Sequence, residues 1–104
     1  MEYTQLDLFK DRVREKSDET FLEAAAADGG KKAFYRVWIE KLDEGFIVRK
    51  ESGSQNKILD RRNWWFEMYP DAKEYHQKLI REKTNPSRKS PRKYSIKSTA
   101  VHSN

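Results

Sequence analysis

Between residues 34 and 66, three runs of aromatic and β-branched residues alternate with two polar segments of turn composition. The runs are Phe34–Glu40, Phe46–Lys50 and Lys57–Phe66, and the turns are Leu42–Gly45 and Ser52–Asn56. Such residues favour strands, and Gly45 is free to adopt a positive backbone φ angle in a tight turn. The pattern predicts an antiparallel meander, and one face of that sheet must be covered before it is stable.

One amphipathic helix follows and supplies the cover. Pro70 suits the first helical turn, and Asn85-Pro86 ends the helix. Residues at helical spacing form a single stripe: Ala72, Tyr75, His76, Leu79, Ile80 and Lys83. We expect a helix of about 14 residues whose Tyr75, Leu79 and Ile80 pack on alternate strand residues, which is an α+β layer arrangement.

The N-terminal residues 1–32 have a different composition. Thr20 and Glu23 have capping-box spacing, four alanines follow, and Gly29-Gly30 is a plausible stop. This pattern predicts a helix over residues 18–28. The predicted fold class is therefore α+β: a small antiparallel sheet of three or more strands covered by one helix, plus an N-terminal helical extension. The expected organisation is an extension over 1–32, a domain over 33–94 and a flexible basic tail over 95–104.

Charge is unevenly placed along the 104 residues. The formal net charge is +5, and residues 86–104 hold five basic residues and no acidic one. This end of the chain is either a solubilising tail or a basic arm that contacts phosphates.

Several function classes have little support in the sequence. The absence of cysteine excludes disulfide scaffolds, thiolate metal sites and cysteine nucleophiles. No membrane span, signal peptide, catalytic motif or metal motif is recognised, and His76 and His102 have no reason to meet. We expect a cytoplasmic, non-catalytic protein with no cofactor, no small-molecule substrate and no membrane partner, in which His76 is a boundary residue bonded at its tip.

From residue 34 to residue 94 the chain resembles a WGR domain, the small module beside the catalytic region of DNA-dependent poly(ADP-ribose) polymerases and in many bacterial proteins. The likeness lies in Phe34-Tyr35, in Gly45-Phe46-Ile47-Val48-Arg49, in the helix from Ala72 to Thr84 and in Tyr94. Where the family has Trp-Gly-Arg, this chain has Ser52-Gly53-Ser54. The glycine is kept at a position where the backbone is expected to turn sharply.

The resemblance implies a role in DNA metabolism. In the polymerases the motif's Trp and Arg meet a broken DNA end, and two serines cannot replace them. Basic residues elsewhere are the candidate nucleic-acid contacts: Arg49, Lys50, Arg61, Arg88, Lys89, Arg92 and Lys93. Arg61 and Arg62 are adjacent on a strand, so only one of them can join a given patch. Trp64 and Trp65 are adjacent too, and we expect one in the core and the other at an edge.

The N-terminus carries a second resemblance. Gln5-Leu6-Asp7-Leu8-Phe9 is similar to the pentapeptide by which bacterial replication and repair proteins dock on the sliding clamp. Leu8 and Phe9 would fill an apolar pocket, Leu6 a shallow neighbouring site, and Gln5 would form a hydrogen bond at the rim. The same segment also fits a packed helix, because Leu6, Phe9 and Val13 have helical spacing.

These observations predict a nucleic-acid-associated binding module of bacterial DNA repair or replication. The alternative is a protein–protein adaptor that docks on the sliding clamp or another partner without binding DNA. A third possibility is a small subunit of a larger assembly, with the aromatic residues at the interface.

Overall fold

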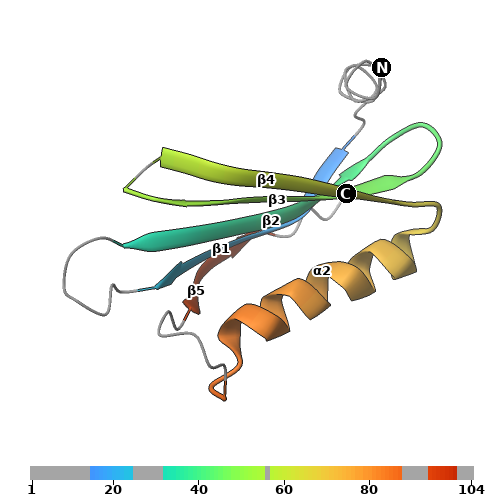
Figure 1. Cartoon of the computed structure of the whole chain (residues 1–104). Coiled ribbons are helices and arrows are strands. Elements are labelled where there is room, and N and C mark those ends of the chain that lie inside the picture. The colour runs from blue at the N-terminus through green and yellow to red at the C-terminus, as the bar shows by residue number, and fades with distance from the viewer. Residues whose placement is uncertain (1–14, 25–31, 56, 88–93, 101–104) are drawn as a thin grey trace.

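Five antiparallel strands and one helix make up the described part of the chain (Figure 1). The structure is a computed structural model, and it describes residues 15–24, 32–55, 57–87 and 94–100. The elements follow in the order β1 (Glu15–Ala24), β2 (Ala33–Lys41), β3 (Phe46–Ser54), β4 (Lys57–Phe66), α2 (Tyr69–Thr84) and β5 (Tyr94–Ala100). The strand order across the sheet is β4-β3-β2-β1-β5, so the last strand returns to pair with the first.

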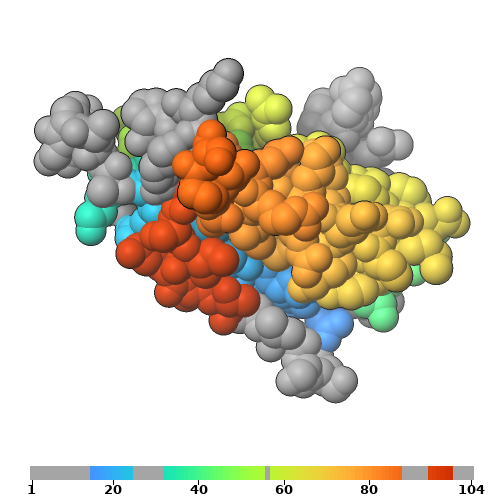
Figure 2. Space-filling view, turned by 90° about the horizontal axis from the view of Figure 1, so that it is seen from below, coloured from blue at the N-terminus to red at the C-terminus, as the bar shows by residue number. Residues whose placement is uncertain are grey.

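The sheet is covered on one face by α2, which forms the second layer (Figures 1 and 2). The core lies between them and is built from alternate strand residues, including Leu22, Tyr35, Val37 and Val48. From the helix, Leu79 is buried in this core, and Tyr75 and Ile80 pack against it. The predicted helix with its apolar stripe and the three strands of the predicted meander are therefore confirmed in position, with β4 at one edge of the sheet.

The predicted N-terminal helix is wrong, and the fold is mostly β. Residues 15–24 form β1, whose side chains alternate between faces, with Thr20, Leu22 and Ala24 buried under α2. Helix propensity is a weak preference, and a strand that gains hydrogen bonds to β2 on one side and β5 on the other overrides it.

The division into an extension, a domain and a tail also differs from the structure. Part of the expected N-terminal extension lies inside the sheet as β1, and residues 95–100 of the expected tail belong to β5. β5 contains two Ser, one Thr and one Lys and is mostly exposed, so its hydrophobic pattern is weak, but its backbone pairs with β1 from Glu19 to Ala24. The sheet thus draws strands from both ends of the chain.

The two glycines at the hairpins permit close packing. Gly45 does not have the positive φ expected for it; a Cβ there would lie 2.7 Å from the Trp65 ring and 2.8 Å from the Phe66 carbonyl oxygen. At Gly53, a Cβ would lie 1.9 Å from the Lys57 carbonyl oxygen, at a register shift between β3 and β4. Both positions therefore exclude a side chain because a neighbour occupies its place.

Candidate functional site

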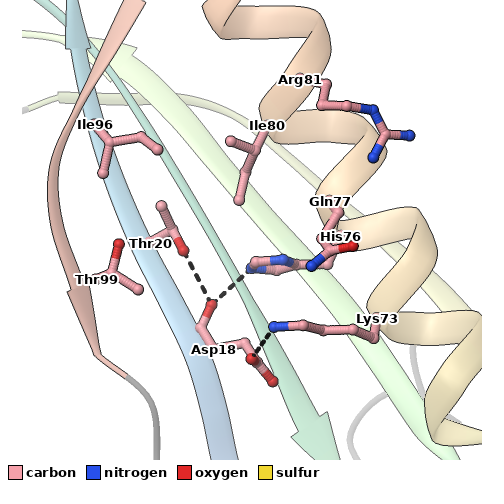
Figure 3. A pocket seen from close by; sticks show the side chains of 9 residues that line it. All are labelled: Asp18, Thr20, Lys73, His76, Gln77, Ile80, Arg81, Ile96 and Thr99. Carbon is pink, nitrogen blue, oxygen red and sulfur yellow. Dashed lines mark hydrogen bonds and ion pairs between the residues drawn. The ribbon is translucent and has the colours of Figure 1, made fainter.

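A buried polar cluster joins β1 to the middle of α2 (Figure 3). Asp18 lies at a register shift between β1 and β2, has a φ of 57°, and is only 3% exposed. Its carboxylate accepts hydrogen bonds from Tyr69 Oη (2.7 Å), Ser17 Oγ (2.9 Å) and Lys73 Nζ. Because a non-glycine residue is strained at positive φ, this bulge is held in place by its contacts with the helix.

The backbone of Asp18 completes the connection. Its carbonyl oxygen lies 2.6 Å from His76 Nε2, which must carry the proton and donate it, and Thr20 Oγ1 donates to the same oxygen at 3.3 Å. His76 is 3% exposed, so it lies deeper than the expected boundary position, but its tip is hydrogen-bonded as predicted. Its Nδ1 is buried without a hydrogen-bond partner in the part of the chain that the structure describes.

Burial and these contacts set the ionisation of the cluster. Burial raises the pKa of Asp18, but the hydrogen bonds from Lys73, Tyr69 and Ser17 outweigh it and leave the pKa below its usual value. Burial, together with the Asp18 carboxylate, raises the pKa of Tyr69 to about 12. Burial lowers the pKa of His76, against the opposing effect of the Asp18 carbonyl. At neutral pH Asp18 is therefore a carboxylate and His76 a neutral imidazole.

A cavity of about 340 Å³ opens beside this cluster, between α2 and the strands β1 and β5. In the space-filling view, atoms of β1 are visible in the gap between α2 and β5 (Figure 2). Ile80 and Ile96 form apolar sides of the cavity, and Asp18, Lys73 and His76 converge at its polar side (Figure 3). Since the carboxylate of Asp18 is already satisfied by its neighbours, the cluster serves to hold the helix on the sheet.

The structure separates the basic residues that were expected to form one patch. Arg49 and Arg61 point to the face opposite α2: Arg49 Nε donates to Glu40 at 2.6 Å, and Arg61 Nε donates to Glu51 at 3.0 Å. Lys50 points to the helix side, where it is hydrogen-bonded to Asp60 and its ammonium lies 5.5 Å from the centre of the Tyr35 ring. On the open face, cations and carboxylates alternate, and this balance leaves little net attraction for phosphate.

Arg61 was the predicted nucleic-acid contact, but Arg62 is the arginine that lies beside Lys50. The two are direct cross-strand partners in the β3–β4 register, and Arg62 Nε lies 3.3 Å from Asp60. Lys83 approaches from the end of α2, with its ammonium 5.0 Å from the Tyr35 ring centre and 5.7 Å from that of Tyr94. Strand alternation starting from Lys50 would have identified Arg62, provided that the register was known.

These cations lie between the middle of the sheet, where Lys50 and Arg62 pair, and one of its ends; we call this region the basic end. It consists of Lys50, Lys57, Arg62 and Lys83, together with the points where the chain leaves at Ser87 and returns at Tyr94. Strand pairing places Ala24, Ala33, Ser54, Lys57 and Tyr94 at this same end. Ser52, Gly53 and Ser54 are the last residues of β3 there, although they were expected in a loop.

The remaining predicted contacts lie outside the described residues. They are Arg88, Lys89, Arg92 and Lys93 of the basic segment, and Gln5, Leu6, Leu8 and Phe9 of the clamp-like motif. Docking on a sliding clamp therefore stays a prediction. For the basic segment, the described residues on either side, Ser87 and Tyr94, fix where it begins and ends.

The searches for known relatives found none. No family model, no curated protein and no solved structure matches this chain. Within the described residues, no group of three His, Cys, Asp or Glu side chains is placed to hold a metal ion. No helix among these residues is long and apolar enough to cross a membrane.

Proposed function

We propose that this chain is a non-catalytic, cytoplasmic module of DNA metabolism that contacts nucleic-acid phosphates at its basic end. The observation that carries the proposal is the convergence of Lys50, Arg62 and Lys83 with both attachment points of the segment Arg88–Lys93. That segment contributes four positive charges over six residues. A set of cations on one surface is the arrangement that binds a phosphate backbone.

The individual cations are suited to this role in different degrees. The side chain of Arg62 is 67% exposed, so its guanidinium can exchange Asp60 for a phosphate with little desolvation cost. The side chain of Lys50 is only 12% exposed and is better placed to neutralise Asp60 while Arg62 binds. The resemblance to the WGR domain supports the same end of the sheet, because Ser52-Gly53-Ser54 lies there.

Two neighbouring arginines offer a matched test. Arg61 and Arg62 are equally exposed at 67% and each faces one carboxylate, but they lie on opposite faces of the sheet. We expect Arg62→Gln to weaken binding of a short DNA duplex several-fold and to lower the slope of log affinity against log salt by about one unit. Arg61→Gln should change neither the affinity for the duplex nor this slope.

Changing Arg88, Lys89, Arg92 and Lys93 together to Gln should remove most of the salt dependence. The measurement is fluorescence anisotropy of a labelled duplex at several salt concentrations. The proposal fails if the unmodified chain does not bind at low salt. Equal losses in the Arg61 and Arg62 variants would show that the contact is not made on the helix side.

A further inference from the structure

Three bulky apolar side chains are exposed where β4 leads into α2, at the opposite end of the sheet from the basic end. Trp65 is 50% exposed, Met68 58% and Tyr69 38%. The β2–β3 turn lies against them, since Gly45 is in close contact with the Trp65 ring, and the ring centres of Phe46 and Tyr69 are 5.5 Å apart. Trp65 is paired with Ile47 and points, like Arg61, to the face opposite α2, whereas Tyr69 contacts Phe46 on the helix side. Tyr and Met are enriched at the centres of protein interfaces, so Met68 and Tyr69 have the composition of a docking site.

Exposed carboxylates lie at the same end of the sheet. Glu44 lies in the β2–β3 turn, Glu67 between β4 and α2, and Asp71 and Glu74 in the first turns of α2; all four are exposed. None of the four has an ion-pair or hydrogen-bond partner within the described residues, although Lys41 also lies at this end. By contrast, Asp18, Glu40, Glu51 and Asp60 are each paired with a cation.

A groove of about 380 Å³ adjoins this surface on the β4 side of the helix. Its lining residues are Phe66, Asp71, Glu74, Tyr75, Lys78 and Arg81. The groove thus holds two carboxylates and two cations, and the Lys78 ammonium lies 5.7 Å from the centre of the Tyr75 ring. A Lys or Arg side chain placed beside Asp71 and Glu74 would meet opposite charges.

We propose that the helix side of this end, formed by Met68 and Tyr69 with the carboxylates of Glu67, Asp71 and Glu74, docks a basic segment of a partner protein. The apolar side chains require a bulky apolar residue in that segment, and the carboxylates, which have no partner within the described residues, require Lys or Arg on either side of it. The surface shares no residue with the basic end, so the proposal stands independently of nucleic-acid binding.

The test uses the full chain, labelled with ¹⁵N, and two short synthetic peptides. In the first peptide Lys and Arg flank a Leu-Phe pair; in the second, Glu replaces each Lys and Arg. We expect saturable binding of the basic peptide alone, with shifts confined to amides near residue 44 and residues 65–74. Shifts centred elsewhere, or no saturation at millimolar peptide, would overturn the proposal.

Variants with equal net charge separate a specific site from general attraction. The double variant Glu67→Lys and Glu74→Lys should bind the basic peptide about tenfold more weakly. A matched double variant, Glu23→Lys and Glu82→Lys, should bind as the unmodified chain does, and equal losses would overturn the proposal. Met68→Ala should also weaken binding without altering the fold, because this side chain is largely exposed. Spectra of the free protein that change with its concentration at low salt would assign the surface to a second copy of the chain instead.

Discussion

At the basic end of the sheet, Lys50 and Arg62 share Asp60 across the β3–β4 pair, whereas at the opposite end Glu67 and Glu74 have no partner within the described residues. The first arrangement holds cations in place and leaves an excess of them; the second leaves carboxylates exposed beside aromatic rings. A net charge of +5 does not show this separation. The difference teaches that the two ends are suited to partners of opposite charge.

The largest effect expected of any substitution concerns the N-terminal motif. Residues 1–14 precede Glu15, which is paired in register with Lys41 and so begins β1 at the end where the carboxylates lie. If the motif binds a sliding clamp, replacing Leu8 and Phe9 by Ala should abolish capture, because each buried side chain contributes about 1.5–3 kcal/mol.

DNA binding at the other end should be unchanged in the same variant. A pull-down with purified clamp, alongside the anisotropy titration, measures both. Unaltered capture would remove the motif from consideration, and a parallel loss of DNA affinity would show that the two ends do not act separately.

Substitutions of the two hairpin glycines compare how much each end of the sheet contributes to the free energy of unfolding. At Gly53 a Cβ would meet the backbone of Lys57 at 1.9 Å, whereas at Gly45 it would meet the half-exposed Trp65 ring at 2.7 Å and the Phe66 carbonyl oxygen at 2.8 Å. We expect Gly53→Ala to lower the free energy of unfolding by about 3 kcal/mol and Gly45→Ala by about 1 kcal/mol, since the overlap with backbone is much smaller at Gly45. Urea unfolding measures both, and the reverse order would contradict the described hairpin geometry.

The smallest expected effect concerns His76, whose hydrogen bond to Asp18 holds α2 on β1. It tests whether both ends of the sheet depend on this contact. Because the pKa of His76 is lower in the folded than in the unfolded chain, its contribution to stability is present above pH 6.5 and is lost as the pH falls toward its folded pKa. The decline should not exceed about 1.4 kcal/mol for each pH unit.

His76→Gln should reduce the dependence of stability on pH in this range, because the amide can still donate to the Asp18 carbonyl but does not titrate. Thermal unfolding between pH 7 and pH 5 makes the measurement. An unchanged slope in the variant would place the titrating group elsewhere. Asp18 adds a further loss only below its ordinary value of 3.8, since its pKa is also lowered in the fold.

Local patterns predicted the centre of this fold well. The hairpins and the amphipathic helix depend on neighbours in sequence. β2, β4 and α2 lie where composition and spacing placed them, and β3 begins where expected but continues to Ser54. β1 was misassigned because alanine content and a capping pattern dominated the alternation of Thr20, Leu22 and Ala24. β5 was missed because its partner lies at the other end of the chain, and no local signal reports that pairing.

Prediction of the candidate sites was limited in the same way, by contacts between residues that are far apart in the sequence. Arg61 and Arg62 could be assigned to opposite faces from their adjacency alone, but which one joins Lys50 depends on the register shift at Gly53. Asp18 gave no signal as a buried anchor, because its partners Tyr69, Lys73 and His76 come from a helix some fifty residues later. Bringing Glu44 to the same end of the sheet as Glu67 likewise requires the turn at Gly45 to meet the end of β4.

The pairing of β5 with β1 has a consequence for biosynthesis. During translation, β1 emerges before β2, β3, β4 and α2, and β5 emerges after them, so one flank of β1 exposes unsatisfied amides and carbonyls until β5 has been made. Long-range closure of this kind slows folding relative to helical proteins of similar length. Before β5 is made, the nascent chain is thus open to unwanted strand pairing, and chaperones that shield extended segments would aid its yield.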